Sequence, residues 1–347
     1  MPETTPQVAQ DILDSSVVID GCTFALHGTE FPGYDALIGK GLVTAMFLTV
    51  PFAEQGPAAA QRSINKLWRE AAAPGSGLAI AICPDDVRQA KVQGKTALII
   101  TFQHWEPIGS SLDALHGFWR LGLRVQQIAY NEMGHAAAGC LEQGDFGLTR
   151  LGRRAVPVMN ELGLMIDLSH ASDQTCREVI DATTKPVVLS HANPRSRAPN
   201  PRNKPDDIIL GVAATGGVIG LSPWGPICWR GPGHPRPTLA DFAGHVAYVA
   251  DLVGVDHIAF GSDTTVDGAV DTVDYWDTAL AYPEVAGDYS REVGDSPAVR
   301  YPEGFGSQAG LPLVVEALQE QGFSSNDITK FLGHNLMRVW AEILPED

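Results

Sequence analysis

Short apolar runs recur along the chain, each about the length of a strand, and segments with helical spacing separate most of them. The runs are rich in Val, Ile and Leu and do not alternate with polar residues, a pattern typical of parallel strands buried on both faces. We expect strands in residues 16–22, 42–50, 96–103, 124–131, 163–170, 186–192, 217–223 and 257–263.

The segments between these runs carry helix signals at their ends. The helix predicted from Thr149 should stop at Gly163, where a left-handed cap is easily formed. Thr238 with Asp241, and Ser324 with Asp327, have the spacing of capping boxes, so helices are expected to begin there.

Eight strands alternating with helices favour an α/β fold of the (β/α)8 (TIM) barrel class, formed by residues 1–347 as a single domain. A doubly wound open sheet is the alternative, but no glycine-rich phosphate-binding loop follows any strand. Residues 194–206, 223–237 and 264–310 each follow a strand, which would place them on the catalytic face of a barrel. The long loop at about 264–310 is expected to lie over the active-site face and to shape the substrate pocket.

Composition limits the classes of partner and the cellular compartment that we expect for this protein. A net charge of −17 argues against nucleic-acid or anionic-membrane partners, because phosphate would be repelled. The five cysteines are scattered and odd in number, which favours a reducing compartment. The first residues lack the pattern of a signal peptide, and the longest uncharged stretch, 208–229, is broken by Gly and Pro. We therefore expect a cytoplasmic protein.

Polar side chains stand at the ends of several predicted strands, and in a barrel these ends face one shared cavity. Two histidines, a carboxylate and softer donors converging there suit a divalent metal such as zinc. Hydrogen-bonded structural histidines are the alternative. The strand-end residues are Asp20, Cys22, Gln103, His104, Tyr130, Asn131, His170, His191 and Asp263. The histidines expected to be structural or exposed to solvent are His27, His116, His245, His257 and His334.

Several stretches together resemble the membrane (renal) dipeptidase family, the M19 metallopeptidases of the amidohydrolase superfamily. They are "GDFGLTRLGRRAVPVMNELGLMIDLSHAS", "PVVLSHANPRS", "NPRNKPDD", "VGVDHIAFGSD" and "GFSSNDITKFLGHNLMRVW". The resemblance runs from about Val17 to Trp340 and is weakest in 264–310. It implies a (β/α)8 barrel, a binuclear zinc site, hydrolysis of dipeptides or related small amides, and a homodimer.

The resemblance also implies roles for four residues. His170 and His191 fall on the two histidines that bind the family's second zinc. Asp263 falls on an aspartate that is both a metal ligand and the group that handles the proton. Arg202 falls on the arginine that holds the substrate carboxylate.

Other positions depart from the family. In "IDGCTF", Cys22 and Phe24 replace a His-x-Asp pair, Gln103 replaces the glutamate that bridges the metals, and Tyr130 replaces a substrate-polarising histidine. Without the bridging carboxylate, two close dications would repel each other with less compensation.

We therefore predict one zinc per chain, or none. His170 and His191 would bind it, with Asp263 or Gln103 and with Cys22 as a further candidate ligand. His104 and Glu106 are possible replacement ligands; the alternative places them on the loop surface.

These residues predict a metal-dependent hydrolase that cleaves an amide in a small carboxylated molecule. Asp263 would transfer the proton and Tyr130 would donate to the developing oxyanion. Arg202, Tyr130, Asn131 and His104 would contact the substrate. Two alternatives remain open: a lyase, hydratase or specialised pathway enzyme on the same scaffold, and a metal-free, non-catalytic binding homologue.

Overall fold

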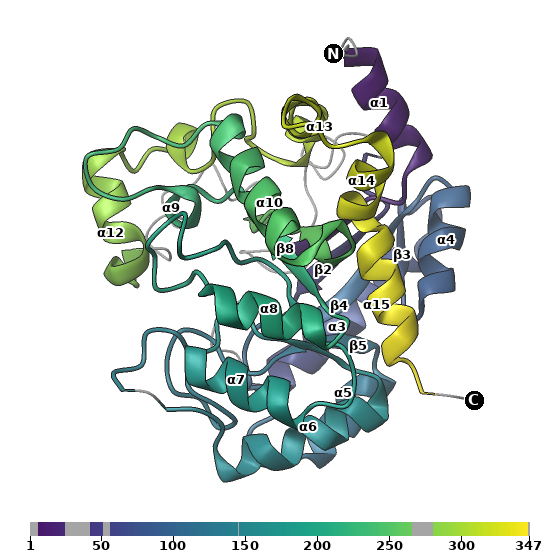
Figure 1. Ribbon diagram of the computed structural model, residues 1–347. Coiled ribbons are helices and arrows are strands. Elements are labelled where there is room, and N and C mark those ends of the chain that lie inside the picture. Colours follow the sequence, from purple (N-terminus) through teal and green to yellow (C-terminus); the bar gives the residue numbers. More distant parts are fainter. Residues whose placement is uncertain (1–5, 25–41, 51–55, 145, 266–279, 346–347) are drawn as a thin grey trace.

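Parallel strands form the centre of the structure, and helices surround them (Figure 1). The computed structural model describes residues 6–24, 42–50, 56–144, 146–265 and 280–345. Its strands are β1 (Ile19–Phe24), β2 (Ala45–Thr49), β3 (Leu78–Ile80), β4 (Thr96–Phe102), β5 (Leu123–Gln127), β6 (Met165–Asp167), β7 (Val188–Leu189), β8 (Val218–Leu221), β9 (Ile258–Phe260) and β10 (Thr264–Thr265).

The sheet closes on itself. Its strands pair in parallel in the order β10-β1-β2-β4-β5-β6-β7-β8-β9. Strand β10 follows β9 almost directly and pairs with β1, Thr23 opposite Thr264. The fold is therefore a (β/α)8 TIM-barrel-like fold, as predicted. Each of the eight expected runs overlaps a barrel strand. Two short strands were not expected: β3, which pairs with the first half of β4, and β10.

Helices follow the strands and lie around the outside of the barrel. In Figure 1, α6, α7 and α8 lie side by side, and α10 continues this outer layer. The described helices are α1 (Pro6–Ser15), α3 (Pro57–Ala71), α4 (Pro84–Val92), α5 (Asp113–Arg120), α6 (Arg150–Leu162), α7 (Asp173–Ala182), α8 (Asp206–Ala214), α9 (Gly225–Cys228), α10 (Leu239–Val253), α12 (Pro283–Glu292), α13 (Leu311–Glu320), α14 (Ser325–Thr329) and α15 (Asn335–Ile343). Among the described residues, no helix is both long and apolar enough to span a bilayer.

Side chains alternate between two apolar cores, as strand geometry requires. Inward-facing strand residues such as Phe47, Ile99 and Val218 pack with Trp340 of α15. Their outward-facing neighbours pack against the surrounding helices. Helix α15 therefore packs into the inner core. The polar residues of the site lie at the carboxyl ends of the strands.

The predicted helix ends are confirmed, with one difference near the C-terminus. Helix α6 ends on Gly163 in the left-handed conformation (φ 65°), and both predicted capping boxes are present. The expected C-terminal helix is broken by a π-helical turn, Lys330–His334. The backbone of Gly333 is non-helical at this kink, and a side chain there would approach the carbonyl oxygen of Val17 to 2.2 Å, so only glycine fits beside the start of β1.

The loops expected over the barrel mouth are partly regular. The described part of 264–310 contains β10 and α12, and residues 266–279 lie outside the described residues. Helix α12 packs against α9, which belongs to the segment after β8. The assignment of residues 1–347 to a single domain stays a prediction.

Glycines leave room in the barrel for the loop that carries His191. A Cβ added at Gly220 of β8, or at Gly261 after β9, would lie 2.0 Å from the carbonyl oxygen of Ser190. Neither position therefore accepts a side chain without displacement of the backbone next to His191.

We predict that Gly220→Ala destabilises the protein by about 3 kcal/mol or more, because overpacking against backbone cannot relax by rotamer changes. The matched control is Gly117→Ala on the exposed face of α5, where nothing lies within 4 Å of the added methyl group. It should be neutral or stabilise by up to about 1 kcal/mol. Urea unfolding of both variants tests this, and equal midpoints would contradict it.

Candidate active site

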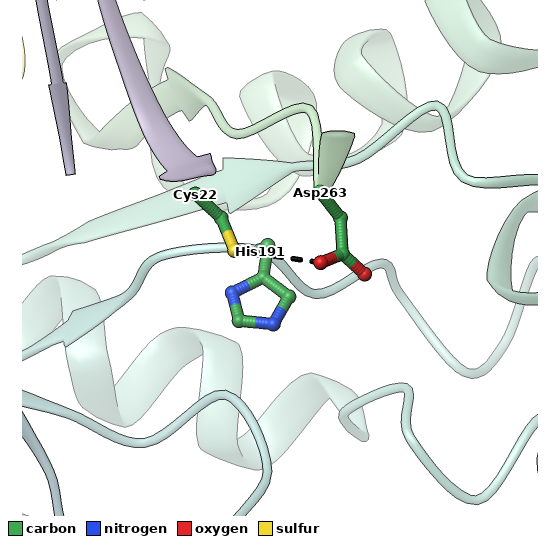
Figure 2. A group of neighbouring side chains, drawn as sticks. All are labelled: Cys22, His191 and Asp263. Carbon is green, nitrogen blue, oxygen red and sulfur yellow. Dashed lines mark hydrogen bonds between the residues drawn. The ribbon is translucent and has the colours of Figure 1, made fainter. Parts of the chain in front are cut away.

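Three potential metal ligands meet at the carboxyl ends of the strands. Cys22 lies on β1, His191 follows β7 and Asp263 follows β9, and Figure 2 shows their side chains gathered together. One ligand atom from each lies within 4.8 Å of the other two. Among the described residues, this is the one such group of three or more His, Cys, Asp or Glu side chains.

His170, which follows β6, adjoins this group. Its Nε2 atom lies 3.0 Å from Nε2 of His191, so the structure brings the two predicted histidines together. Both rings are buried. Burial, together with the positive charge of Arg202, holds the pKa of each imidazole well below its usual range. The pair is therefore uncharged at neutral pH.

Hydrogen bonds hold the opposite side of each ring. Nδ1 of His170 lies 2.6 Å from Oδ1 of Asn131, and Nδ1 of His191 lies 2.7 Å from the hydroxyl of Ser190. That hydroxyl donates to Oδ2 of Asp167 (2.5 Å), while the Ser169 hydroxyl donates to Oδ1 (2.6 Å). Asn131 positions His170 in this way, and its contact with substrate stays a prediction.

Asp263 has a left-handed backbone (φ 60°), which is uncommon for a residue with a side chain. Its backbone N–H donates to the carbonyl of Cys22 at the seam of the barrel, 2.9 Å away. Its Oδ1 atom lies 3.5 Å from the Cys22 sulfur. Burial raises the pKa of the Asp263 carboxyl, against an opposing effect of Arg202. This strained conformation directs the carboxyl group towards the other ligands.

Cys22 and Gln103 contact each other. The Gln103 amide Nε2 donates to the Cys22 sulfur at 2.9 Å. Burial, with the nearby carboxylates, raises the pKa of the Cys22 thiol well above its usual range. Phe24 packs against Trp229 and Tyr289, so the position that departs from the family's carboxylate belongs to an apolar cluster.

Tyr130 is stacked between two imidazoles. Its ring lies 4.3 Å from that of His104 and 4.1 Å from that of His170, measured between centroids. Burial, and then the Asp263 carboxylate, raise the pKa of its phenol, which stays protonated and able to donate. His104, Tyr130 and Asp263 are the members of the site that keep partial exposure, so they mark its open side.

His104 and Glu106, the possible replacement ligands, lie outside the metal-ligand group, which consists of Cys22, His191 and Asp263. Nδ1 of His104 is 3.6 Å from a carboxylate oxygen of Glu106, whose side chain is 38% exposed. Neither belongs to the group formed by Cys22, His191 and Asp263. Of the remaining histidines, His245 is buried against the carbonyl of Cys228, and burial lowers its pKa to about 4. His27 lies outside the described residues.

Arg202 is buried beside the imidazoles. Its guanidinium donates to the carbonyl oxygens of Ser169 and His191. Arg202 makes no ion pair with Asp206 or Asp207, the acidic residues nearest to it along the chain: Asp206 accepts from Tyr248 and Ser196, and Asp207 pairs with Arg177. The structure therefore places this cation at the site rather than on the loop surface.

Two supporting residues were missed in the sequence. Asp167 and Ser190 lie behind the imidazoles, and Ser190 bonds the ring of His191 directly. The signal was present, because a serine precedes each histidine in "LSH" and an aspartate ends β6. Only the spatial pairing of β6 with β7 connects them.

Comparison with known proteins identifies the family of the chain. Residues 38–300 match the family model described as membrane dipeptidase (peptidase family M19). Dipeptidase verJ of Clonostachys rogersoniana is 28% identical over 268 residues, which are 77% of this chain and 60% of that protein. The matched part of this chain thus spans about three fifths of that relative's length.

Solved structures show the same fold. An amidohydrolase from Pseudomonas aeruginosa superposes with a TM-score of 0.82 and 29% identity, covering 97% of this chain and 99% of its own. The probable dipeptidase PvdM from the same organism gives 0.79 with 18% identity, covering 99% of both chains. Because the family match extends over well more than half of its residues, this chain belongs to the membrane dipeptidase family, peptidase family M19.

Proposed function

We propose that this protein is a hydrolase with one divalent metal, which cleaves an amide bond in a small molecule that carries a carboxylate. One observation carries the proposal: two uncharged imidazoles face each other through Nε2 atoms 3.0 Å apart. Family membership supports a dipeptidase-like hydrolase.

The hydrogen-bond network assigns the tautomer of each ring. The Ser190 hydroxyl donates its one hydrogen to Asp167. The Ser190 oxygen can therefore only accept a hydrogen bond from His191, whose Nδ1 atom carries the proton. The Asn131 oxygen likewise accepts from Nδ1–H of His170. Both Nε2 atoms are then bare acceptors pointing at each other, an arrangement that repels unless a cation lies between them.

The donor set fits a zinc-like ion. Two imidazoles, with Asp263 as an oxygen donor, are ligand types found in catalytic zinc sites. A bound ion would supply Lewis acidity and lower the pKa of water. Gln103 turns its Nε2 atom to Cys22, so we assign it a supporting role instead of ligation.

The protein's own residues would supply the remaining chemistry. Asp263 accepts a proton from the attacking water and delivers it to the leaving nitrogen, a role that its raised pKa suits. Tyr130, protonated and held between two rings, donates to the developing oxyanion. Arg202 contributes the positive charge that a substrate carboxylate requires. His104 lies on the open side of the site, next to the position for substrate.

A metal-free binding protein is the second candidate. The observation that favours it is the apolar packing of Phe24, which leaves fewer oxygen donors than the family site has. Homodimer formation, cytoplasmic location and the absence of nucleic-acid or membrane partners stay predictions from the sequence.

We predict at most one equivalent of zinc or cobalt per chain after reconstitution and desalting, because Phe24 and Gln103 remove two carboxylates from the family's set. Elemental analysis measures the content, and a panel of dipeptides and N-acyl amino acids measures the activity. Two equivalents would refute the one-metal site. Protein without metal, even after excess zinc, would favour the binding protein instead.

We predict that Ser190→Ala weakens metal binding about 10- to 100-fold, because the ring of His191 loses the partner that sets its tautomer. The matched control is Ser196→Ala in the same loop, where the exposed hydroxyl bonds Asp206. Competition with a chromophoric chelator gives both dissociation constants. The same loss in both variants would mean a general effect on the loop.

We predict that Arg202→Ala raises KM for a carboxylated substrate about 30-fold, which corresponds to about 2 kcal/mol. A neutral amide analogue should lose far less, because it makes no ion pair. Arg195→Ala, which removes an ion pair with Asp173, is the control and should leave both KM values unchanged. Equal increases for the two substrates would rule out carboxylate recognition by Arg202.

A further inference from the structure

Cys22 is the member of the metal-ligand group that the proposed hydrolysis does not use. Its side chain is 2% exposed, and its sulfur lies with His191 and Asp263 within the 4.8 Å group (Figure 2). A buried cysteine usually packs as a small apolar residue. Here its sulfur faces a carboxylate, an imidazole and an amide, none of which is an apolar neighbour.

Gln103 supplies the observation that separates a ligand from a packed thiol. Its Nε2 atom donates to the sulfur at 2.9 Å, although the N–H groups of an amide find better acceptors in oxygen. Its backbone carbonyl is held by the Gln127 side chain at 2.7 Å, which anchors this residue at the end of β4. Such a donor stabilises negative charge on sulfur and orients it.

The two departures from the family at positions 22 and 103 are consistent with each other. A carboxylate at 103 would repel a thiolate at this distance, whereas the neutral amide supports one. A thiolate also offsets one positive charge of a bound dication, which a histidine at position 22 would not do. One anionic donor is thus lost at 103 and another becomes available at 22.

We propose that Cys22 binds the metal as a thiolate, next to His191 and Asp263, with Gln103 as the hydrogen-bond donor to its sulfur. The proposal rests on the proposed function, since it requires a cation at that site. As the sulfur–metal bond forms, the thiol proton passes to solvent, and neither metal nor sulfur changes oxidation state.

A thiolate in the ligand set changes which metals the site prefers. Soft sulfur favours zinc, cobalt and cadmium over manganese and magnesium, which prefer oxygen donors. The full-length wild-type protein should therefore bind cadmium at least about 100-fold more tightly than manganese. This comparison needs no variant, and similar affinities for the two metals would overturn the thiolate ligand. Imidazoles alone also favour cadmium over manganese, so the cobalt spectrum of the wild type decides whether sulfur is a ligand.

The direct test is titration of the metal-free, full-length protein with cobalt(II). A thiolate ligand gives a sulfur-to-cobalt charge-transfer band in the near-ultraviolet, separate from the visible ligand-field bands. We expect this band in the wild type, its loss in Cys22→Ser with the visible bands retained, and its retention in Cys228→Ser. Cys228 is the control because it is equally buried but belongs to α9, outside the metal-ligand group.

The outcomes distinguish the proposed thiolate ligand from the proposed metal-dependent hydrolase on which it rests. Visible cobalt bands without a charge-transfer band in the wild type would overturn the thiolate ligand and leave the metal-dependent hydrolase intact. A charge-transfer band that survives Cys22→Ser would assign the sulfur to another cysteine and also overturn it. No cobalt binding in any form would remove both proposals together.

Gln103→Met tests the supporting hydrogen bond. The variant keeps the length of the side chain and removes the N–H donor, so the charge-transfer band should persist at a shifted energy. Cobalt affinity should fall about 10-fold, as for other residues that support a metal ligand. An unchanged band and affinity would show that Gln103 does not act on the sulfur.

Discussion

The buried carboxylate of Asp167 ties together the two strand ends that carry the imidazoles. It accepts hydrogen bonds from the backbone N–H groups of Ser169 and Ser190 and from both of their hydroxyls. A carboxylate in a barrel interior is costly unless its oxygens are bonded in this way. All four donors follow β6 or β7 directly, so satisfying this one group fixes the positions from which His170 and His191 extend.

The same bonds that satisfy Asp167 determine what the imidazoles can do. A serine hydroxyl that donates to the carboxylate has only its lone pairs left for His191, and these select the ring's Nδ1–H form. Backbone carbonyls of the same two loops, those of Ser169 and His191, hold Arg202. Fold stability, ligand geometry and the charge available to a substrate therefore depend on one set of contacts.

The site is a modified version of the family's arrangement, and its changes are linked. Phe24 joins Trp229 and Tyr289 in an apolar cluster, and Gln103 bonds the sulfur of Cys22. Both changes remove a carboxylate from the proposed cation site. Fewer carboxylates fit one dication better than two, because the repulsion between two ions would be less compensated. We propose a single metal on the basis of this charge balance.

The amino-acid sequence determined the strands, most helix ends and the positions of His170, His191 and Asp263 at strand ends. Burial on both faces demands continuous apolar runs, and caps such as Gly163 depend on local backbone chemistry. Tertiary structure alone decided the direction of Gln103 towards Cys22, 81 residues away, and the serine bonds of Asp167. It also decided the break at Gly333, where the carbonyl of Val17 leaves no room for a side chain. These features depend on distances between segments far apart in the chain, which no local pattern of residues records.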